Sequence, residues 1–132
     1  MASLPARTNK SPTFTARELD VMSALWTQGP STVAQVRSTI TDPLAYTTVL
    51  TMLRTLEAKG HVAHAEGDRA HLFRARVTRE VAGGAALRLL LDRIFGGSPL
   101  ALVDQLAGLK GVSATDLKQI RKRLKRRLKS RS

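Results

Sequence analysis

A run of threonines with one arginine, in the segment AYTTVLTMLRTLEAKG (residues 45–60), holds the side chains with the clearest binding chemistry. Thr47, Thr51 and Arg54 follow the spacing i, i+4, i+7, which places them on one face of a helix. Threonine hydroxyls bind phosphate oxygens or base edges, threonine methyls contact thymine, and arginine binds guanine or phosphate. Each threonine costs a helix about 0.5 kcal/mol relative to alanine, so helix stability does not account for them. We therefore expect this face to contact nucleic acid; the alternative is that the threonines are only solvated.

The same segment carries the apolar spacing of a helix with one buried face. Val49, Met52, Leu53 and Leu56 occupy positions i, i+3, i+4 and i+7. The threonine face lies opposite them on a helical wheel, so a core beneath the helix would fix the direction in which the threonines point. Six residues of this helix are expected to contact the partner: Tyr46, Thr47, Thr48, Leu50, Thr51 and Arg54.

Two shorter helices are predicted ahead of this one, each opened by a capping box. Thr15 and Glu18 form the first box, and Thr32 and Gln35 form the second. The first helix should end at Gly29-Pro30, and its expected buried residues are Leu19, Met22, Leu25 and Trp26. The second helix should bury Val33, Val36 and Ile40.

A turn and a hairpin complete this part of the chain. Asp42-Pro43 is predicted to form the turn and cap before the long helix. Residues 61–77 alternate weakly about Glu66-Gly67-Asp68-Arg69, which predicts a β-hairpin. Helix, short helix, turn, long helix and hairpin is the order of a winged helix-turn-helix, whose third helix enters the DNA major groove. Arg69 at the hairpin tip and Arg74 on its second strand are therefore candidates for contacts to the DNA backbone.

The remaining polar residues lack the spacing that a metal site or a catalytic site requires. His61, His64 and His71 lie on or beside the hairpin, and His64 and His71 could face each other, but no carboxylate or thiolate has suitable ligand spacing. The chain has no cysteine, which excludes disulfides, thiolate catalysis and cysteine-based metal sites. The acidic residues are scattered, without the pairing that acid–base catalysis requires. The sequence therefore predicts a protein that is no enzyme and needs no cofactor or metal.

Residues 78–132 are predicted to be helical throughout. Gly83-Gly84 weakens the first of these helices by about 1 kcal/mol per glycine relative to alanine, so its ordered part is expected to start near Ala85. The other two should open at Ser98-Pro99 and at Ser113. Their apolar stripes are long for helices with so little else to cover, which predicts a homodimer. The expected dimer contacts are Leu87, Leu91, Ile94, Phe95, Leu102, Val103, Leu106, Leu117, Ile120 and Leu124.

The charge is concentrated at the C-terminus. The chain carries a formal net charge of +12, and the segment from Lys118 to Ser132 holds nine basic residues and no acidic one. Such a run favours a polyanion as partner, nucleic acid before membrane. We expect residues 117–124 to pack in the dimer and the end of the helix to fray and attract DNA; the alternative is a charge run kept only for solubility. A second possible function is thus a sequence-neutral, nucleoid-type coating protein driven by this basic tail.

Length and composition add the expected organisation of the chain. No run approaches the 18 apolar residues of a membrane span, and the N-terminus lacks the apolar core of a signal peptide, so we expect a cytoplasmic protein without membrane insertion. The fold class is mainly α with a small β-hairpin wing. The expected parts are a flexible arm (1–12), a winged helix-turn-helix DNA-binding domain (13–77) and a helical dimerisation module with a basic tail (78–132).

Three segments, ELDVMSALW, LAYTTVLTMLRTLEAKG and GDRAHLFRARVTRE, together resemble the penicillinase and methicillin-resistance repressor family of bacterial winged-helix regulators (the BlaI/MecI type). The resemblance runs from Thr15 to about Leu128 and includes FGGSPLALV in the helical third. It implies a homodimeric repressor that binds a palindromic double-stranded DNA operator, with residues 46–59 in the major groove.

The chain also departs from the family pattern. Many members have arginine-leucine where this chain has Thr55-Leu56, with Arg54 one place earlier. The resemblance implies a membrane sensor protease as a further partner, and members that it cleaves carry an Asn-Phe bond whose counterpart here is Gln105-Leu106. Related copper-responsive repressors hold metal with C-terminal cysteines, which this chain lacks.

Overall fold

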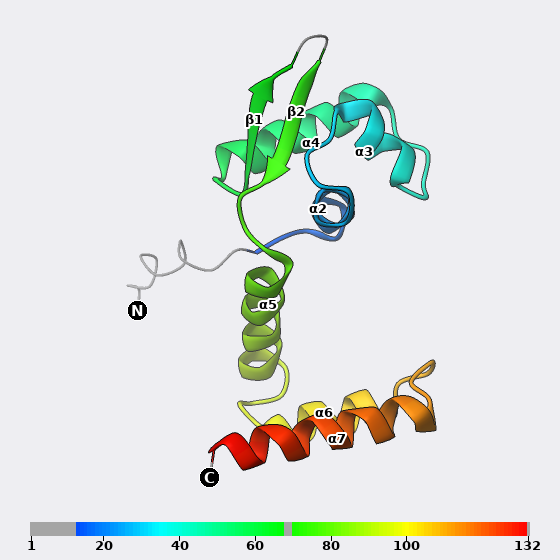
Figure 1. Cartoon of the computed structure of the whole chain (residues 1–132), viewed down its shortest axis with the longest axis vertical. Coiled ribbons are helices and arrows are strands. Elements are labelled where there is room, and N and C mark those ends of the chain that lie inside the picture. The colour runs from blue at the N-terminus through cyan, green and yellow to red at the C-terminus, as the bar shows by residue number, and fades with distance from the viewer. Residues whose placement is uncertain (1–12, 68–69, 132) are drawn as a thin grey trace. The chain divides into compact units, whose positions relative to one another are not determined.

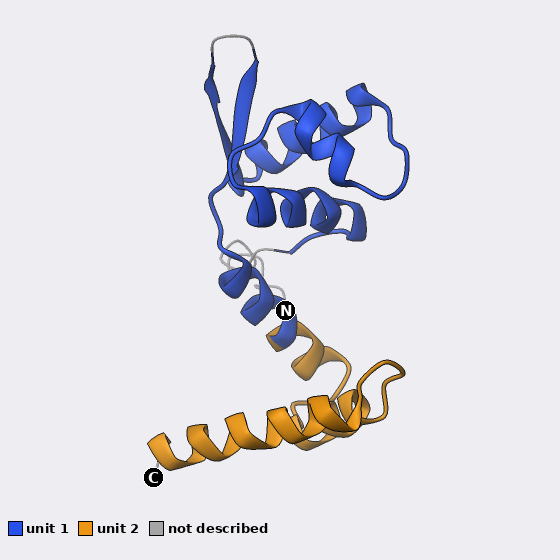
Figure 2. Ribbon diagram, turned by 45° about the vertical axis from the view of Figure 1, so that its right-hand side comes forward, with its two compact units in different colours: residues 1–87 blue, residues 88–132 orange. Residues whose placement is uncertain are grey.

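The computed structural model describes residues 13–67 and 70–131, so the expected arm (1–12) and Arg69 lie outside the described residues. In chain order the elements are α2 (Ala16–Gln28), α3 (Val33–Thr39), α4 (Tyr46–Ala58), β1 (Val62–Glu66), β2 (His71–Ala75), α5 (Arg79–Arg93), α6 (Pro99–Ala107) and α7 (Ala114–Arg131) (Figure 1). The chain divides into two compact units, Met1–Leu87 and Arg88–Ser132 (Figure 2). The first unit has the predicted order of a winged helix-turn-helix, mainly α with a hairpin wing.

Helix α2 begins as predicted. The Thr15 hydroxyl accepts the Glu18 backbone N–H at 3.1 Å, and the Thr15 N–H donates to the Glu18 carboxylate at 2.9 Å. The helix ends at Gly29, whose φ of 82° favours glycine. The expected burial of Leu19 is wrong, because its side chain is 41% exposed. The buried face is centred near Leu25, and Leu19 lies about 120° from it at 100° per residue.

The remaining buried positions of α2 show which side of this helix the core covers. Val21, Met22, Ala24 and Leu25 are all buried, while Trp26 is half-buried at the edge of the core. Val21 and Ala24, which the sequence prediction missed, take the place expected for Leu19. The helix is therefore rotated relative to the predicted face.

Helix α3 has the predicted capping box, and α4 starts differently from the prediction. Thr32 and Gln35 cap each other's backbone, and Val33 and Val36 are buried. The N-cap of α4 is Ala45, so Asp42-Pro43 does not cap it. Asp42 instead accepts a hydrogen bond from Arg17 at 2.7 Å, an attraction from another helix that no local pattern could indicate.

Strands β1 and β2 form the antiparallel wing, which packs on α4 and α2. The register pairs Val62 with Ala75 and His64 with Phe73. Ser31, in the loop between α2 and α3, bridges the other edge of β2: its N–H donates to the Phe73 carbonyl at 2.9 Å, and the Phe73 N–H donates back at 2.8 Å. The hairpin is thereby tied to the helices at its base.

The hydrophobic core lies among α2, α3, α4 and the wing. Its members come from all of these elements, so the orientation of each helix is fixed by the others. They are Val21, Met22, Ala24, Leu25, Val33, Val36, Val49, Leu53, Leu56, Val62 and Phe73.

Helix α5 contradicts the expectation that order begins near Ala85, since it runs unbroken from Arg79 through both glycines. Contacts at its start explain this. The Thr78 hydroxyl accepts the Val81 N–H at 3.1 Å, Ala82 is buried, and Arg79 lies 5.6 Å from the centre of the Trp26 ring. The Trp26 indole N–H also donates to the Val77 carbonyl at 2.8 Å. These contacts offset the low helix propensity of glycine.

The second unit contains helices α6 and α7, both opened by the predicted serines. The Ser98 hydroxyl accepts the Ala101 N–H at 3.1 Å, and Ser113 and Asp116 cap each other. The expected fraying beyond Leu124 is not observed, because α7 stays helical to Arg131. Within residues 88–131 no side chain is buried.

Candidate nucleic-acid interface

The exposed face of α4 carries most of the predicted contact residues. Thr47, Thr48, Thr51 and Arg54 are exposed along it, and Tyr46 is exposed at its start. Leu50 is half-buried and packs against the core, so it offers less surface than the other five. The helix therefore presents hydroxyls, methyls and one guanidinium group to solvent in a single strip.

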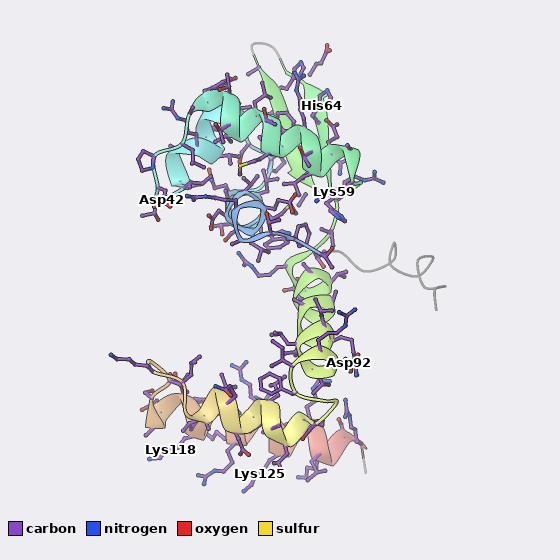
Figure 3. All side chains as sticks on the ribbon, turned by 180° about the vertical axis from the view of Figure 1, so that it is seen from behind. Asp42, Lys59, His64, Asp92, Lys118 and Lys125 are labelled. Atoms are coloured by element: carbon purple, nitrogen blue, oxygen red, sulfur yellow. The ribbon has the colours of Figure 1, made fainter. Side chains whose placement is uncertain are left out.

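The opposite face of α4 holds this strip in place. Val49, Leu53 and Leu56 are fully buried, which fixes the rotation of the helix about its axis. At the C-terminal end the Lys59 ammonium group donates to the Glu18 carboxylate at 2.9 Å, across to the start of α2 (Lys59 is labelled in Figure 3). The packing and this ion pair together make α4 a rigidly oriented element.

The buried Glu18 carboxylate has an altered pKa. Burial by itself raises its pKa, but the hydrogen bonds from the Thr15 backbone and from Lys59 outweigh that effect, so the pKa lies below its ordinary value. The pKa of His61 also lies below its ordinary value. Burial lowers it because His61 is charged when protonated, the nearby Lys59 lowers it further, and Glu18 partly opposes both effects. The site is therefore electrostatically tuned to hold Glu18 ionised beside Lys59.

Two arginines that sequence analysis missed fix the loop before α4. Arg17 pairs with Asp42 at 2.7 Å, and the Arg37 Nε donates to the Leu44 carbonyl at 2.7 Å. Arg37 lies in the last turn of α3, where a cation near helix carbonyls is a usable sequence signal. Arg17 lies 25 residues from Asp42, so only the folded chain brings them together. Both arginines therefore help to position the start of α4.

Polar groups on α4 differ in how many hydrogen-bond donors and acceptors remain unused within the chain. The Thr51 hydroxyl donates to the Thr47 carbonyl at 2.8 Å, which leaves its oxygen free to accept. Among the described residues, no hydrogen bond or ion pair holds the Arg54 guanidinium group. The start of α4 has no side-chain cap, so its first backbone N–H groups remain available to an anion.

One of the two contact residues predicted on the wing lies within the described part of the chain. Arg74 is exposed on β2, paired in register with Ala63 on the face away from the core, while Arg69 lies outside the described residues. His64 and His71 stack with ring centres 4.8 Å apart, so they do face each other as predicted. The His64 Nδ1 lies 2.6 Å from the Glu57 carboxylate of α4, which anchors the wing to that helix.

Two further features of the described residues bear on the chemistry of the site. Within residues 13–67 and 70–131, no group of three or more His, Cys, Asp or Glu side chains is arranged to hold a metal ion. None of the helices in this described part is both long and apolar enough to cross a bilayer.

Two solved structures illustrate the similarity of this chain to known folds. A MarR family protein from Bacillus stearothermophilus matches with a TM-score of 0.54 at 14% identity, covering 90% of this chain and 76% of that one. Transcriptional regulator Tm0710 from Thermotoga maritima matches with a TM-score of 0.46 at 19% identity, covering 89% and 78%. At these identities the first match supports the fold alone. Among curated proteins, none matches the chain.

The family comparison is more specific. The sequence profile described as penicillinase repressor matches residues 14–126, which includes all of the winged helix and most of the C-terminal helices. The suspected resemblance is thereby confirmed. The chain belongs to the penicillinase repressor family and is a winged-helix transcriptional regulator.

Proposed function

We propose that this regulator is a sequence-specific repressor that binds a palindromic operator as a homodimer, with α4 in the major groove. The observation that carries the proposal is the exposed strip of Thr47, Thr51 and Arg54 on a helix whose other face is fully buried. A rigid helix with polar groups on its outer face is what base recognition in the major groove requires.

The hydrogen bonds already made along the strip favour different roles for its threonines and its arginine. Because the Thr51 hydroxyl already donates to the Thr47 carbonyl, it can accept a hydrogen bond from an adenine or cytosine amino group, while its methyl can contact thymine. Arg54 has its five N–H donors available for guanine or phosphate. Tyr46, Thr47 and Thr48 lie at the uncapped start of α4, where backbone N–H groups can also bind a phosphate.

Contacts from the wing would position the protein without specifying sequence. Arg74 is exposed on β2, and we assign it to the DNA backbone together with Arg69. Such contacts set the register of the recognition helix on the duplex. The anchoring of the wing to α4 through His64 and Glu57 would keep the two contact regions in a constant relation.

The C-terminal helices supply the proposed dimer interface. Val103 of α6 and Leu117, Ile120, Leu124 and Leu128 of α7 line one apolar groove. No side chain in residues 88–131 is buried in the single chain, so this unit lacks the core that a stable fold needs. A second copy would cover the predicted contacts, which are Leu87, Leu91, Ile94, Phe95, Leu102, Val103, Leu106, Leu117, Ile120 and Leu124.

A membrane sensor protease is a further proposed partner, by membership of the family. Gln105 and Leu106 are exposed on α6, within a regular helix. A neighbouring gene for a membrane protein with a zinc-protease motif would support this partner, and incubation of the two proteins should then release a fragment cut at this bond. An intact chain after that incubation would exclude it.

Selection of binding sites from a random duplex pool tests the proposed function. A two-fold operator should be enriched, with half-sites about one helical turn, roughly 34 Å, apart. Sedimentation of the complex should give two chains per operator. Recovery of unenriched sequences with uniform affinity would instead identify a sequence-neutral coating protein.

A further inference from the structure

The positive charge of this chain lies mainly outside its winged helix. Residues 88–132 hold twelve basic and three acidic side chains, whereas residues 1–87 hold ten basic and seven acidic ones. The unit assigned to sequence recognition is therefore only slightly cationic. The unit assigned to dimerisation carries most of the electrostatic attraction for a polyanion.

Helix α7 organises this charge around a narrow apolar stripe. Leu117, Ile120, Leu124 and Leu128 fall within an arc of about 80° at 100° per residue. Apart from Arg131, which falls inside this arc, the basic residues of α7 occupy the rest of the circumference, and the structure keeps this helix regular to Arg131. Figure 3 shows Lys118 and Lys125 extending from its ribbon. The charge thus faces outward in almost every direction that the stripe leaves open.

The C-terminal half of α7 contains a concentrated guanidinium cluster. Arg123, Arg126 and Arg127, together with Ser130, line one surface hollow, at the spacing i, i+3, i+4 and i+7. Like charges at these spacings repel each other and weaken a helix. A phosphate group beside them would remove the repulsion and accept several charge-assisted hydrogen bonds.

Two features favour DNA over a membrane surface as the polyanion. The apolar stripe of α7 covers only a narrow arc and lines one groove together with Val103 of α6, so this helix has little apolar surface to insert into lipid. The helix also contains no aromatic residue, whereas interfacial helices typically use Trp or Phe to insert. The family to which the chain belongs already places it on DNA.

We propose that the C-terminal half of α7, residues 121–131, is a second DNA-binding surface that contacts the phosphate backbone of duplex DNA without sequence preference. This surface is separate from α4 and needs no operator. It would raise the affinity for any duplex and steepen the dependence of that affinity on salt. The ratio of operator binding to random binding would be left to α4.

The test compares two triple variants of the full-length protein on a duplex of random sequence. R123Q/R126Q/R127Q neutralises the cluster, and the control R88Q/R93Q/K110Q removes the same charge elsewhere in residues 88–132. Affinity is measured across a salt series. The cluster variant should lose up to about 2.7 per protomer from the log-log slope, at about 0.9 for each lost phosphate contact, and the control should lose much less.

Equal slopes for the cluster variant and the unmodified protein would overturn the proposal. Equal losses in both variants would also overturn it, by showing a net-charge effect without a local surface. Circular dichroism and sedimentation verify that the helix and the oligomeric state persist. Should the triple variant misfold, K122Q/R126Q changes only side chains opposite the apolar stripe and should lose about 1.8.

Further experiments identify which molecule supplies the phosphate groups that the cluster contacts. If the surface contacts DNA flanking the operator, lengthening a selected duplex from about 20 to about 40 base pairs should tighten binding only when the cluster is intact. If it holds a second duplex, a labelled unrelated duplex should join a preformed operator complex. Binding of anionic vesicles that depends on the cluster, with an unchanged DNA salt slope, would reject DNA in favour of a membrane. Because these measurements score affinity and salt dependence, they can fail while the sequence preference proposed for α4 stands.

Discussion

The two units of the chain differ in what holds them together. In the first, side chains from α2, α3, α4 and the wing form a shared core, with Leu53 and Phe73 among its fully buried members. In the second, α6 and α7 are about as amphipathic as α2 and α4, yet no side chain in residues 88–131 is buried. The apolar residues of the first unit meet each other within one chain. Those of the second stay exposed or half-buried within residues 88–131, which is why we propose that a second copy of the chain covers them.

The largest expected effect tests that requirement. Ile94 is 66% exposed in the single chain, so Ile94→Asp should cost the isolated fold little. In a dimer it would place an unpaired carboxylate in an apolar interface, at a cost of about 3 to 5 kcal/mol. The dimer dissociation constant should therefore rise at least roughly 100-fold, as measured by sedimentation equilibrium.

A matched substitution shows whether position matters in this experiment. Leu89 is 44% exposed on α5, on the side away from the expected contacts Leu87, Leu91, Ile94 and Phe95 at 100° per residue. Leu89→Asp should leave the dimer intact. If Ile94→Asp also sedimented as a dimer, Ile94, which directly follows α5, would have no place in the interface.

A pair of identical substitutions gives the next largest effect and contrasts the units directly. Leu53 is fully buried and Leu124 is 54% exposed. Leu53→Ala should lower the free energy of unfolding of the first unit by about 2 to 5 kcal/mol, independently of protein concentration. Leu124→Ala should leave that value unchanged and weaken only the dimer. Denaturation at several protein concentrations separates the two, and a concentration-independent loss at Leu124 would show that α7 has a core within one chain.

Local sequence signals predicted much of this fold. Capping boxes at Thr15 and Thr32 and the serines at Ser98 and Ser113 gave the correct starts of four helices. Each of these signals depends on hydrogen bonds within three residues, so the sequence alone is enough to interpret it. The apolar period of α4 likewise gave its buried face, and with it the outward direction of the threonines.

The errors came from contacts between residues distant in the chain. Asp42 looked like a cap because its pairing with Arg17 could not be seen locally. Gly83-Gly84 looked like a break because the burial of Ala82 and the contact between Arg79 and Trp26 could not be seen locally. The same limit applies to the candidate site, where the exposed strip was predictable but the arginines that fix its loop were not.

The next largest effect separates sequence recognition by the first unit from overall affinity for DNA. Thr47→Ala should lower the preference for a selected operator over random duplex by about 1 to 3 kcal/mol, because it removes a hydroxyl and a methyl from the recognition strip. The measurement is the ratio of the two dissociation constants at one salt concentration. Thr115→Ala, the same change on α7 in the second unit, should leave the ratio unaltered. A reduced overall affinity with an unchanged ratio after Thr47→Ala would assign Thr47 to the phosphate backbone.

The smallest expected effect concerns the ion pair that joins α2 to α4 in the first unit. The Glu18 pKa is lowered in the fold, because hydrogen bonds from Thr15 and Lys59 outweigh the opposing effect of burial. The folded state therefore holds Glu18 ionised at pH values where the unfolded chain binds a proton. Its contribution is fully present above the ordinary pKa of 4.5 and is lost as pH falls through the lower folded value.

Lys59 is 45% exposed, so the pair should be worth no more than about 1 kcal/mol at neutral pH. Glu18→Gln should lower the unfolding free energy by that amount near neutrality and reduce its decline in acid, whereas Glu66→Gln, an exposed carboxylate on β1, should change neither. Parallel acid profiles for Glu18→Gln and the unmodified protein would show that packing alone sets the orientation of α4 against α2.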